Sequence, residues 1–414
     1  ASACPIAPIS LRKVEHRVIK MKKEDDRMRK YHILVVVRHP VGGIRTFFRY
    51  VYRRLDRKKY CFTFIAPDVS EARILMNDLK ELNPRFLPTD RNISHRDLSK
   101  TIIKIVQYEN FDLIHSHGFT SAICSIIGAL ITKTPHVLTC HDVFTPSQFY
   151  GLMGSLKKIV LGLMLMTVDR IHCVTNDARN NLLNYLVILR LFKSRIVVIP
   201  HGIEVNQFLD AEKRNIKHEY TLPEESFLIG FLGRFMSQKG FLYLVEALIE
   251  LKKKNDLPKV PMILCFGEKD GFFREEMEDI RKKKLGESVL FLPFVANVAS
   301  SLKGLDVVAM PSLWEACGLL AMETVVAGVP LIGTNCVGLR EVLKDTPATV
   351  VPTKDSLALS KALESEMRNP TTEKMKRFSV EAAIRFDVKE RATELEILLL
   401  KLIEKNTTAI SDND

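Results

Sequence analysis

Short, continuous apolar runs alternate along this chain with longer stretches whose apolar residues recur at helical spacing. In the first half of the chain, the apolar runs are residues 32–37, 62–66, 113–115, 136–139, 170–174 and 196–199. In the second half they are residues 227–232, 262–266, 289–292, 307–310, 329–332 and 348–351. Stretches with a helical pattern, such as 46–55, 99–108 and 241–252, lie between them. Continuous apolar strands separated by helices are typical of parallel sheets covered on both faces.

Two such series in succession predict an α/β protein of two doubly wound, Rossmann-like domains. The polar stretch 206–225, which ends in Leu222-Pro223, marks the expected boundary between them. We therefore expect a first domain over residues 31–205 and a second domain over residues 206–385. A polar, basic leader over residues 1–30 and a tail over residues 406–414 are expected to be disordered.

Composition narrows the function classes. Residues 1–210 carry 32 lysines and arginines against 18 acids, a balance of +14, whereas residues 211–414 carry 29 against 31, a balance of −2. The basic half is compatible with an anionic membrane surface or an acidic acceptor, but no nucleic-acid-binding motif accompanies it, so nucleic acid is disfavoured. No apolar run has the length of a membrane span. Eight scattered cysteines favour reduced, buried thiols in a cytoplasmic protein.

Two glutamates, Glu315 and Glu323, carry the strongest chemical signal because both lie in an apolar stretch, residues 311–330. A carboxylate in such surroundings needs partners. Glu315 precedes Gly318, where a loop is expected to lead into a helix, and Glu323 falls one and a half turns into that helix. The free N–H groups around Gly318 and Leu319 can hold an anion between the two carboxylates. Two carboxylates that bind hydroxyl groups, with an anion site between them, suit a nucleotide sugar, which carries a sugar hydroxyl, a phosphate and a ribose hydroxyl in that order.

Further candidates follow predicted strands, where open parallel sheets bind their ligands. Gly42 and Gly43 come before a helix, where glycines let the backbone approach a phosphate. The alternative interpretation is a tight turn between strand and helix. Gly233 and Arg234, with Lys239 five residues on, supply two cations for a diphosphate and for the charge that develops as it leaves, or are surface cations.

Histidines follow two of the predicted strands, and each allows a functional and a structural interpretation. His141, followed by Asp142, can bind a substrate hydroxyl or act as a general base, with the aspartate fixing its tautomer, or serves only as a hydrogen-bonding histidine between domains. His115 and His117 suggest a metal, but further ligands are missing and a structural role in a loop is favoured. For Gly338, ahead of Arg340 and Glu341, a structural turn is the favoured interpretation.

Taken together and in this order, these motifs resemble the retaining glycosyltransferases of family 4, which have the GT-B fold. The resemblance runs over residues 31–405. The glutamate pair with seven residues between them is the family's strongest signature. The Gly-Arg…Lys-Gly element at 233–240, the glycine loop at 41–43, and segments 112–118, 139–142 and 198–202 also match.

The resemblance implies roles residue by residue. Arg234 and Lys239 would bind the donor diphosphate, Glu315 would contact the transferred sugar, and Glu323 would hold the ribose. Gly318 and Leu319 would meet the phosphate, Gly42 and Gly43 would close over the donor, and His141 would lie near the reacting sugar. No metal or other cofactor is expected. The last helix, 386–405, would cross back to the first domain.

The resemblance leaves the substrates open. Ala316-Cys317 stands where the family commonly has Gly-Phe, which affects how closely this loop approaches the donor. We expect a retaining, metal-independent transferase whose acceptor is a glycan, a glycolipid or a small hydroxyl compound, in cell-envelope polysaccharide or glycolipid synthesis. Uridine diphosphate is a guess from family frequency. The protein is expected at the cytoplasmic side, with peripheral contact to an anionic membrane. A GT-B sugar-nucleotide epimerase and a non-catalytic binding subunit are the alternatives.

Overall fold

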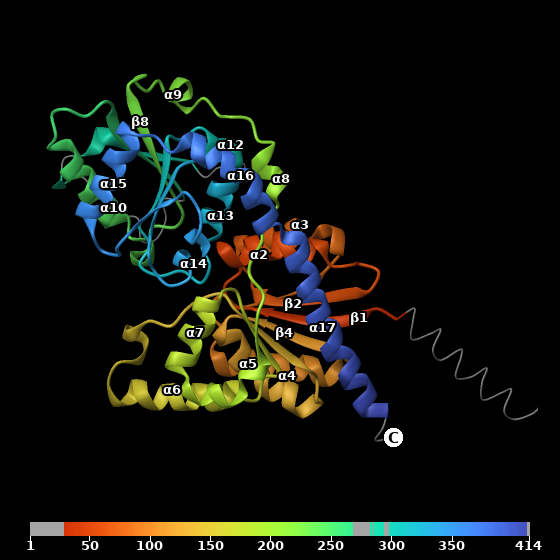
Figure 1. Cartoon of the computed structure of the whole chain (residues 1–414). Coiled ribbons are helices and arrows are strands. Elements are labelled where there is room, and N and C mark those ends of the chain that lie inside the picture. The colour runs from red at the N-terminus through yellow and green to blue at the C-terminus, as the bar shows by residue number, and fades with distance from the viewer. Residues whose placement is uncertain (1–28, 268–281, 284, 294–297, 412–414) are drawn as a thin grey trace, which may run out of the picture.

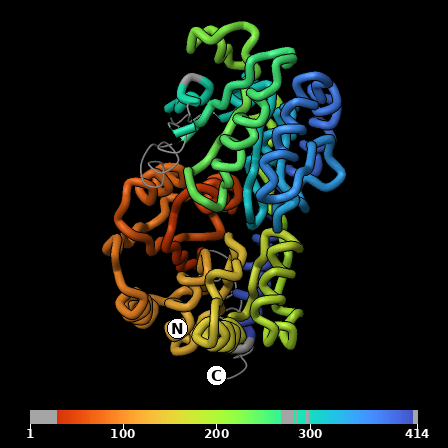
Figure 2. The backbone as a smooth tube through the Cα atoms, turned by 90° about the vertical axis from the view of Figure 1, so that its left-hand side faces the viewer, coloured from red at the N-terminus to blue at the C-terminus, as the bar shows by residue number. Residues whose placement is uncertain are grey.

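The computed structural model describes residues 29–267, 282–283, 285–293 and 298–411, and these form two α/β domains (Figure 1). The red to yellow-green part of the chain builds the lower domain and the green to blue part builds the upper one (Figures 1 and 2). The dark-blue C-terminal helix is the exception, because it returns to the lower domain (Figure 1). Most of the predicted basic leader, residues 1–28, lies outside the described residues.

The first domain is a seven-stranded parallel sheet with strand order β3-β2-β1-β4-β5-β6-β7. Its strands are β1 (Tyr31–Val37), β2 (Tyr60–Pro67), β3 (Arg85–Thr89), β4 (Leu113–His117), β5 (His136–Cys140), β6 (Arg170–Cys173) and β7 (Ile196–Val198). Its α-helices are α2 (Gly43–Val51), α3 (Ser70–Asp78), α4 (His95–Tyr108), α5 (Phe119–Thr132), α6 (Gly151–Leu165) and α7 (Asn176–Tyr185). Short 3₁₀ turns include η1 (Tyr52–Arg54), η3 (Pro146–Phe149) and η4 (Val187–Arg195).

The second domain repeats this plan with six parallel strands in the order β10-β9-β8-β11-β12-β13. The strands are β8 (Ser226–Leu232), β9 (Val260–Phe266), β10 (Val289–Leu292), β11 (Val307–Met310), β12 (Leu331–Thr334) and β13 (Thr349–Val351). The helices are α8 (Val205–Leu209), α9 (Ile216–Glu219), α10 (Phe241–Lys252), α12 (Val298–Lys303), α13 (Leu319–Val326), α14 (Leu339–Leu343), α15 (Ser356–Arg368) and α16 (Thr372–Phe386), with the 3₁₀ turn η5 (Ser237–Lys239). The predicted pair of doubly wound domains is confirmed.

Both sheets have a switch point, where the strand order reverses next to the first strand. In the first sheet β1 lies between β2 and β4, and in the second β8 lies between β9 and β11. Open α/β sheets bind ligands at such points, beyond the carboxyl ends of the strands. The glycine loop follows β1, and the loop with Arg234 and Lys239 follows β8. The fold therefore places both predicted phosphate-binding loops at a switch point.

The chain passes between the domains twice, and the two passages are hydrogen-bonded to each other. The N–H of Ile203 donates to the carbonyl of Phe386 at 2.8 Å, and the N–H of Val388 donates to the carbonyl of Ile203 at 3.1 Å. The last helix, α17 (Val388–Ser411), then packs against α2 and η1 of the first domain (Figure 1). The predicted disordered tail is wrong for residues 406–411, which continue this helix, while 412–414 lie outside the described residues.

Two further observations concern membrane-spanning helices and the cysteines. Within the described residues, no helix is both long enough and apolar enough to cross a membrane. The cysteines of the described segments are free thiols, and all but Cys61 are buried.

Candidate functional site

An ion pair between Lys239 and Glu315 joins the two loops that follow β8 and β11. The ammonium of Lys239 lies 2.6 Å from Oε1 of Glu315, which also accepts a hydrogen bond from the hydroxyl of Ser312 at 2.8 Å. Glu315 is buried, so these two partners supply the compensation that a buried carboxylate requires. A carboxylate and an ammonium are thereby fixed beside each other at the switch point of the second sheet.

Backbone geometry explains why glycine flanks this pair. Gly240 has a φ of +66°, and a Cβ there would lie 2.0 Å from the carbonyl oxygen of Pro311. The Nε2 of Gln238 donates to the carbonyl of Trp314 at 2.9 Å, so the two loops are tied together directly on either side of the ion pair. Gly233, with a φ of +140°, begins the first loop, and a Cβ there would lie 3.8 Å from Cε of Lys239. Only glycine permits this close approach of the two backbones.

Arg234 reaches the first domain. Its guanidinium is exposed and forms no ion pair or hydrogen bond within the described residues. Its Nε lies 3.7 Å from where a Cβ of Gly42 would stand. Gly43, the first residue of α2, is similarly close to Leu319 of α13. The structure thus brings together the glycine loop after β1 and the cationic loop after β8, which are about 190 residues apart in sequence. Arg234 is the cation still available to an anionic ligand.

Glu323 lies on the buried face of α13 and faces the first domain. Its Oε1 accepts a hydrogen bond from the hydroxyl of Tyr50 on α2 at 3.1 Å, and that hydroxyl accepts one from Arg49 at 3.1 Å. Burial raises the pKa of Glu323, and the Tyr50 hydrogen bond and the charge of Arg49 partly offset this. In the free protein, one oxygen of this carboxylate therefore already holds a hydroxyl group.

Two glycines shape the segment between the glutamates. Gly318 has a φ of +89° and precedes α13, whose first N–H groups have no partner inside the helix. A Cβ at Gly338 would lie 2.2 Å from the carbonyl oxygen of Glu315, so the turn before α14 presses against the glutamate segment. This favours the structural interpretation of Gly338 made from the sequence.

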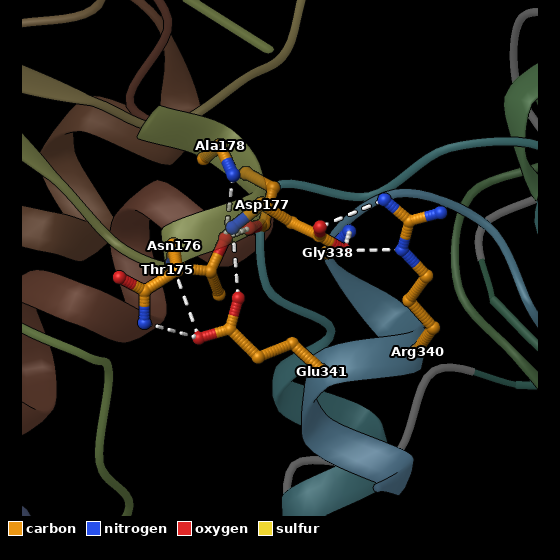
Figure 3. A network of polar contacts seen from close by, with 8 residues as sticks. Thr175, Asn176, Asp177, Ala178, Gly338, Arg340 and Glu341 are labelled. Atoms are coloured by element: carbon orange, nitrogen blue, oxygen red, sulfur yellow. Dashed lines mark hydrogen bonds and ion pairs between the residues drawn. The ribbon is translucent and has the colours of Figure 1, made fainter. Parts of the chain in front are cut away.

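A polar network between the domains holds this segment in place (Figure 3). The carboxylate of Glu341 accepts from the backbone N–H groups of Asn176 and Asp177 at 3.1 and 2.8 Å, at the start of α7. In return, Asp177 accepts from Nε and NH2 of Arg340 at 2.7 and 2.8 Å and from the N–H of Gly338 at 3.1 Å. Burial alone would raise the pKa of Asp177, but these hydrogen bonds outweigh it and leave the pKa below its ordinary value.

Thr175 completes the network and links it to the glutamate pair. Its hydroxyl donates to the carbonyl of Ala316 at 2.8 Å and accepts from the N–H of Ala178 at 3.0 Å, which caps α7. The residue after Glu315 is therefore anchored to the first domain. The substitution of Ala for the family's usual Gly at 316 is compatible with this arrangement, because the contact uses only the backbone carbonyl.

A chain of buried hydrogen bonds runs through the carboxyl end of the first sheet and ends at His141. His172 Nε2 lies 2.8 Å from the carbonyl of Ile199, and His172 Nδ1 lies 3.1 Å from the hydroxyl of Thr139. That hydroxyl is 2.7 Å from His115 Nε2. The hydroxyl of Tyr52 follows, 2.7 Å from His115 Nδ1 and 3.0 Å from His117 Nε2. His117 Nδ1 then lies 2.9 Å from His141 Nε2, where the chain ends.

The carbonyl of Ile199 fixes the direction of every bond in this chain. Burial lowers the pKa of each of these histidines well below its ordinary range, to about 4 for His172, so each neutral ring has one donor and one acceptor nitrogen. A carbonyl only accepts, so His172 donates from Nε2 and accepts from Thr139. Thr139 then accepts from His115. The Tyr52 hydroxyl donates to His115 Nδ1 and accepts from His117 Nε2. His117 therefore accepts at Nδ1, which makes His141 the donor at Nε2.

His141 therefore carries its proton on Nε2 and leaves Nδ1 as an acceptor. Nδ1 makes no hydrogen bond with the described residues, and it is not among their fully buried atoms that lack a partner. It is thus open to accept a hydrogen bond from a hydroxyl group of a ligand. The prediction that Asp142 fixes this tautomer is wrong, because Asp142 accepts from the N–H of Val143 and His117 takes that role.

Replacing Thr139 with valine is expected to move the His141 proton from Nε2 toward Nδ1. Valine keeps the shape but leaves the N–H of His115 without an acceptor. Reversing the hydrogen bonds from His115 to His141 removes that unsatisfied donor, while His172 stays held by the carbonyl of Ile199. The free energy of unfolding should fall by about 1–3 kcal/mol. Ring ¹⁵N shifts in NMR spectra distinguish protonated from bare nitrogens and report the tautomer directly. Thr139→Ser, which keeps the hydroxyl, should retain the original shifts. Unchanged His141 shifts in the valine variant would show that the chain does not set the tautomer.

Asp142 brings a further carboxylate toward the charged loops. Its pKa is raised by partial burial, and the charges of Glu315, Arg234 and Lys239 all act on it. The pKa of His39, after β1, is lowered by burial and by the positive charges of Arg38 and Arg234. Within the described residues, no three histidines, cysteines or acids are grouped as metal ligands. His115 and His117 lie within strand β4 rather than in a loop.

The structure thus gathers the residues singled out in the sequence around one boundary. Arg234, Lys239 and Glu315 form its charged centre, and Gly42, Gly43, Gly318, Leu319 and Glu323 lie where α2 meets α13. His141 approaches from β5 of the first domain. Sequence reasoning missed Tyr50, Thr175 and Ser312, since a tyrosine, threonine or serine without a motif carries no signal until its partner across the fold is known.

Two family models together match most of the chain. The model described as Glycosyltransferase Family 4 matches residues 41–207, and the one described as Glycosyl transferases group 1 matches residues 212–385. The boundary between the two matches coincides with the first passage of the chain between the domains.

Individual relatives agree with these matches. The chain is 27% identical over 272 residues to UDP-Gal:alpha-D-GlcNAc-diphosphoundecaprenol alpha-1,3-galactosyltransferase of Escherichia coli, covering 63% of this chain and 68% of that protein. It is 26% identical over 319 residues to the D-inositol 3-phosphate glycosyltransferase of Corynebacterium kroppenstedtii, covering 73% and 69%. Among solved structures, Anabaena Alr3699/HepE in complex with UDP and glucose superposes with a TM-score of 0.75 at 17% identity, over 90% of this chain and all of that one.

Proposed function

This chain belongs to the glycosyltransferases of family 4 with the GT-B fold, and from that premise we propose that it transfers a sugar from a uridine diphosphate sugar, with retention of configuration and without a metal ion, to a lipid-linked saccharide of the cell envelope. The observation that carries the proposal is the Lys239–Glu315 ion pair, together with Arg234, which has no ion pair or hydrogen bond within the described residues. Two cations and a carboxylate suit a diphosphate and the sugar bound to it.

In this proposal the cations act on the leaving group. Arg234 and Lys239 bind the diphosphate and stabilise the negative charge that grows as the bond between the anomeric carbon and the phosphate oxygen breaks. The acceptor hydroxyl forms the new bond to the same carbon from the same face. Its proton passes to the departing phosphate oxygen, so the chain itself need not supply a nucleophile. Lys239 is already held in place by Glu315 in the free protein, and together with Arg234 it performs the role that a metal ion has in other transferases.

The remaining residues orient the sugar and the nucleoside. Glu315 accepts hydrogen bonds from sugar hydroxyls through the oxygen that Lys239 and Ser312 leave unused. Glu323 holds the ribose hydroxyls, with Tyr50 either sharing that carboxylate or releasing it. His141 accepts a hydrogen bond from a sugar hydroxyl at Nδ1. The choice of uridine and of a lipid-linked acceptor is supported by the names of relatives, among them the galactosyltransferase that acts on a diphosphoundecaprenol substrate.

A nucleotide-release screen across uridine, guanosine and adenosine diphosphate sugars tests this proposal. We expect release from a uridine donor, unchanged by a chelator, and a loss of about 100-fold or more in Glu315→Ala and Glu315→Gln. The glutamine variant keeps the side-chain shape and can still accept from Ser312. A donor that the substituted proteins process as fast as the original would exclude this site, and activity abolished by the chelator would exclude the metal-free mechanism.

A further inference from the structure

Helix α6 exposes an apolar stripe on the first domain, at the end away from the second domain (Figure 1). Its members follow helical spacing and are strongly exposed, with Leu152 at 91% and Met153 at 77%. The stripe consists of Leu152, Met153, Leu156, Ile159, Val160 and Leu163. The opposite face of the helix, with Leu161 and Leu165, is buried in the domain core. The helix is thus apolar on both sides, and the core uses only one of them.

Apolar side chains near α6 extend this surface. Tyr150, just before the helix, is 91% exposed. Helix α5, which packs beside α6, exposes Ile127, Leu130 and Ile131. Contiguous apolar surface of this kind is unusual on a protein without a partner and marks a site of interaction.

The charged residues of α6 and of the end of α5 are lysines. Helix α6 has no acidic residue and contains Lys157 and Lys158, and exposed Lys133 follows α5. Between residues 119 and 168 the sole acid is Asp142, which lies at the domain boundary instead. The ammonium groups of Lys157 and Lys158 also lie 5.5 and 5.6 Å from the ring centre of Phe149, at the base of the helix. An apolar stripe with basic residues beside it has the chemistry of a helix lying in the headgroup region of an anionic bilayer.

A second copy of this chain fits the stripe less well. Packing two α6 helices about a two-fold axis would bring lysines of both copies close together, with no acidic residue on either helix to pair with them. Negatively charged headgroups, in contrast, would neutralise these lysines while the acyl region takes up the leucines.

The chain connects this surface to the proposed site through a short, anchored segment. Only nine residues separate His141, at the end of β5, from the first residue of α6. Phe144 stacks on Phe119 at 4.4 Å between ring centres and meets Phe149 at 5.1 Å, which fixes the segment to the domain core. A lipid held at the start of α6 would therefore be joined to His141 by a segment that is fixed to the domain core.

We propose that α6, with the adjoining end of α5, docks on an anionic membrane surface and draws a lipid-linked acceptor toward His141. Docking itself is independent of the catalytic chemistry, whereas delivery of the acceptor rests on the proposed function.

Co-sedimentation with vesicles, without any donor present, tests the docking alone. The full chain should bind phosphatidylcholine vesicles that contain phosphatidylglycerol, bind pure phosphatidylcholine at least about fivefold more weakly, and be released as ionic strength rises. The Leu152→Ser/Leu156→Ser/Ile159→Ser variant should lose at least about tenfold in vesicle partitioning. Lys157→Gln and Lys158→Gln should each lose about fivefold and reduce the salt dependence.

The control is an equally exposed apolar pair on the other domain. Val380 and Ile384 of α16 are 66% and 78% exposed one helical turn apart, and Val380→Ser/Ile384→Ser should bind vesicles like the original chain. The proposal would be overturned if the original chain did not bind the anionic vesicles, or if the control variant lost as much binding as the α6 variant. Full binding by the α6 variant would overturn it as well. So would a dimer in light scattering that the α6 variant splits while vesicles bind neither protein, since the face would then be a subunit interface. Because no donor is used, failure of sugar transfer leaves the vesicle result unaffected.

Discussion

Replacing Arg234 with methionine is expected to lower sugar transfer by about 100- to 1,000-fold, because it removes one of the two cations that stabilise the charge developing on the leaving diphosphate. The guanidinium has no ion pair or hydrogen bond within the described residues, so the thermal midpoint should stay the same. Steady-state kinetics with the donor identified by the screen, together with thermal unfolding, measure both effects.

A matched control for this variant is Arg96→Met. Arg96 is also exposed and without a polar partner in the described part of the chain, but it lies on α4, away from the domain boundary. It should retain full activity. Lys239→Met should differ from both, since it also strips the buried carboxylate of Glu315 of its cation and therefore lowers stability as well as transfer. If Arg234→Met transferred sugar at the original rate, the assignment of the leaving-group site would be wrong.

Replacing Gly240 with alanine should destabilise the protein by about 3–5 kcal/mol, the largest effect on folding expected from a single methyl group here. Two costs add: a left-handed backbone, with a φ of +66°, and a clash in which the new Cβ would lie 2.0 Å from the carbonyl oxygen of Pro311. Relief of the clash requires the loops that carry Lys239 and Glu315 to move apart, so transfer should fall too. Denaturant-induced unfolding measures the loss.

Gly151 separates the two costs. Its φ is +71°, but nothing lies within 4 Å of where a Cβ would stand. Gly151→Ala should therefore show only the backbone strain, about 1–2 kcal/mol. Equal losses in the two variants would mean that the loops after β8 and β11 are not held in the close contact described.

Much of the architecture could be predicted because parallel strands buried on both faces leave an unmistakable apolar run. Strand β3 was missed for the same reason: it lies at the edge of the first sheet, contains Pro88, and is largely solvent-accessible, so its sequence lacks that run. The predicted disordered tail failed because polar residues there continue a helix that earlier apolar positions had already docked, with Thr407 donating to the carbonyl of Ile403.

The site divides in a similar way between what motifs reveal and what only the fold reveals. Glu315, Arg234 and Lys239 stood in recognisable local patterns. The partner of Glu323 did not, because Tyr50 lies 273 positions away and on the other domain. The tautomer of His141 depends on strand register, which places Thr139 opposite both His117 and His172. No local pattern around His141 contains that information, and the neighbouring Asp142 pointed to the wrong partner.

The central claim is that one site, built from both domains, holds a nucleotide diphosphate sugar at the Lys239–Glu315 pair. A crystal structure of the chain with bound uridine diphosphate tests it most directly. We predict diphosphate oxygens within hydrogen-bond distance of both Arg234 and Lys239, and a ribose hydroxyl bound to Glu323. A diphosphate held away from both cations, with Glu323 contacting no part of the nucleotide, would contradict the account.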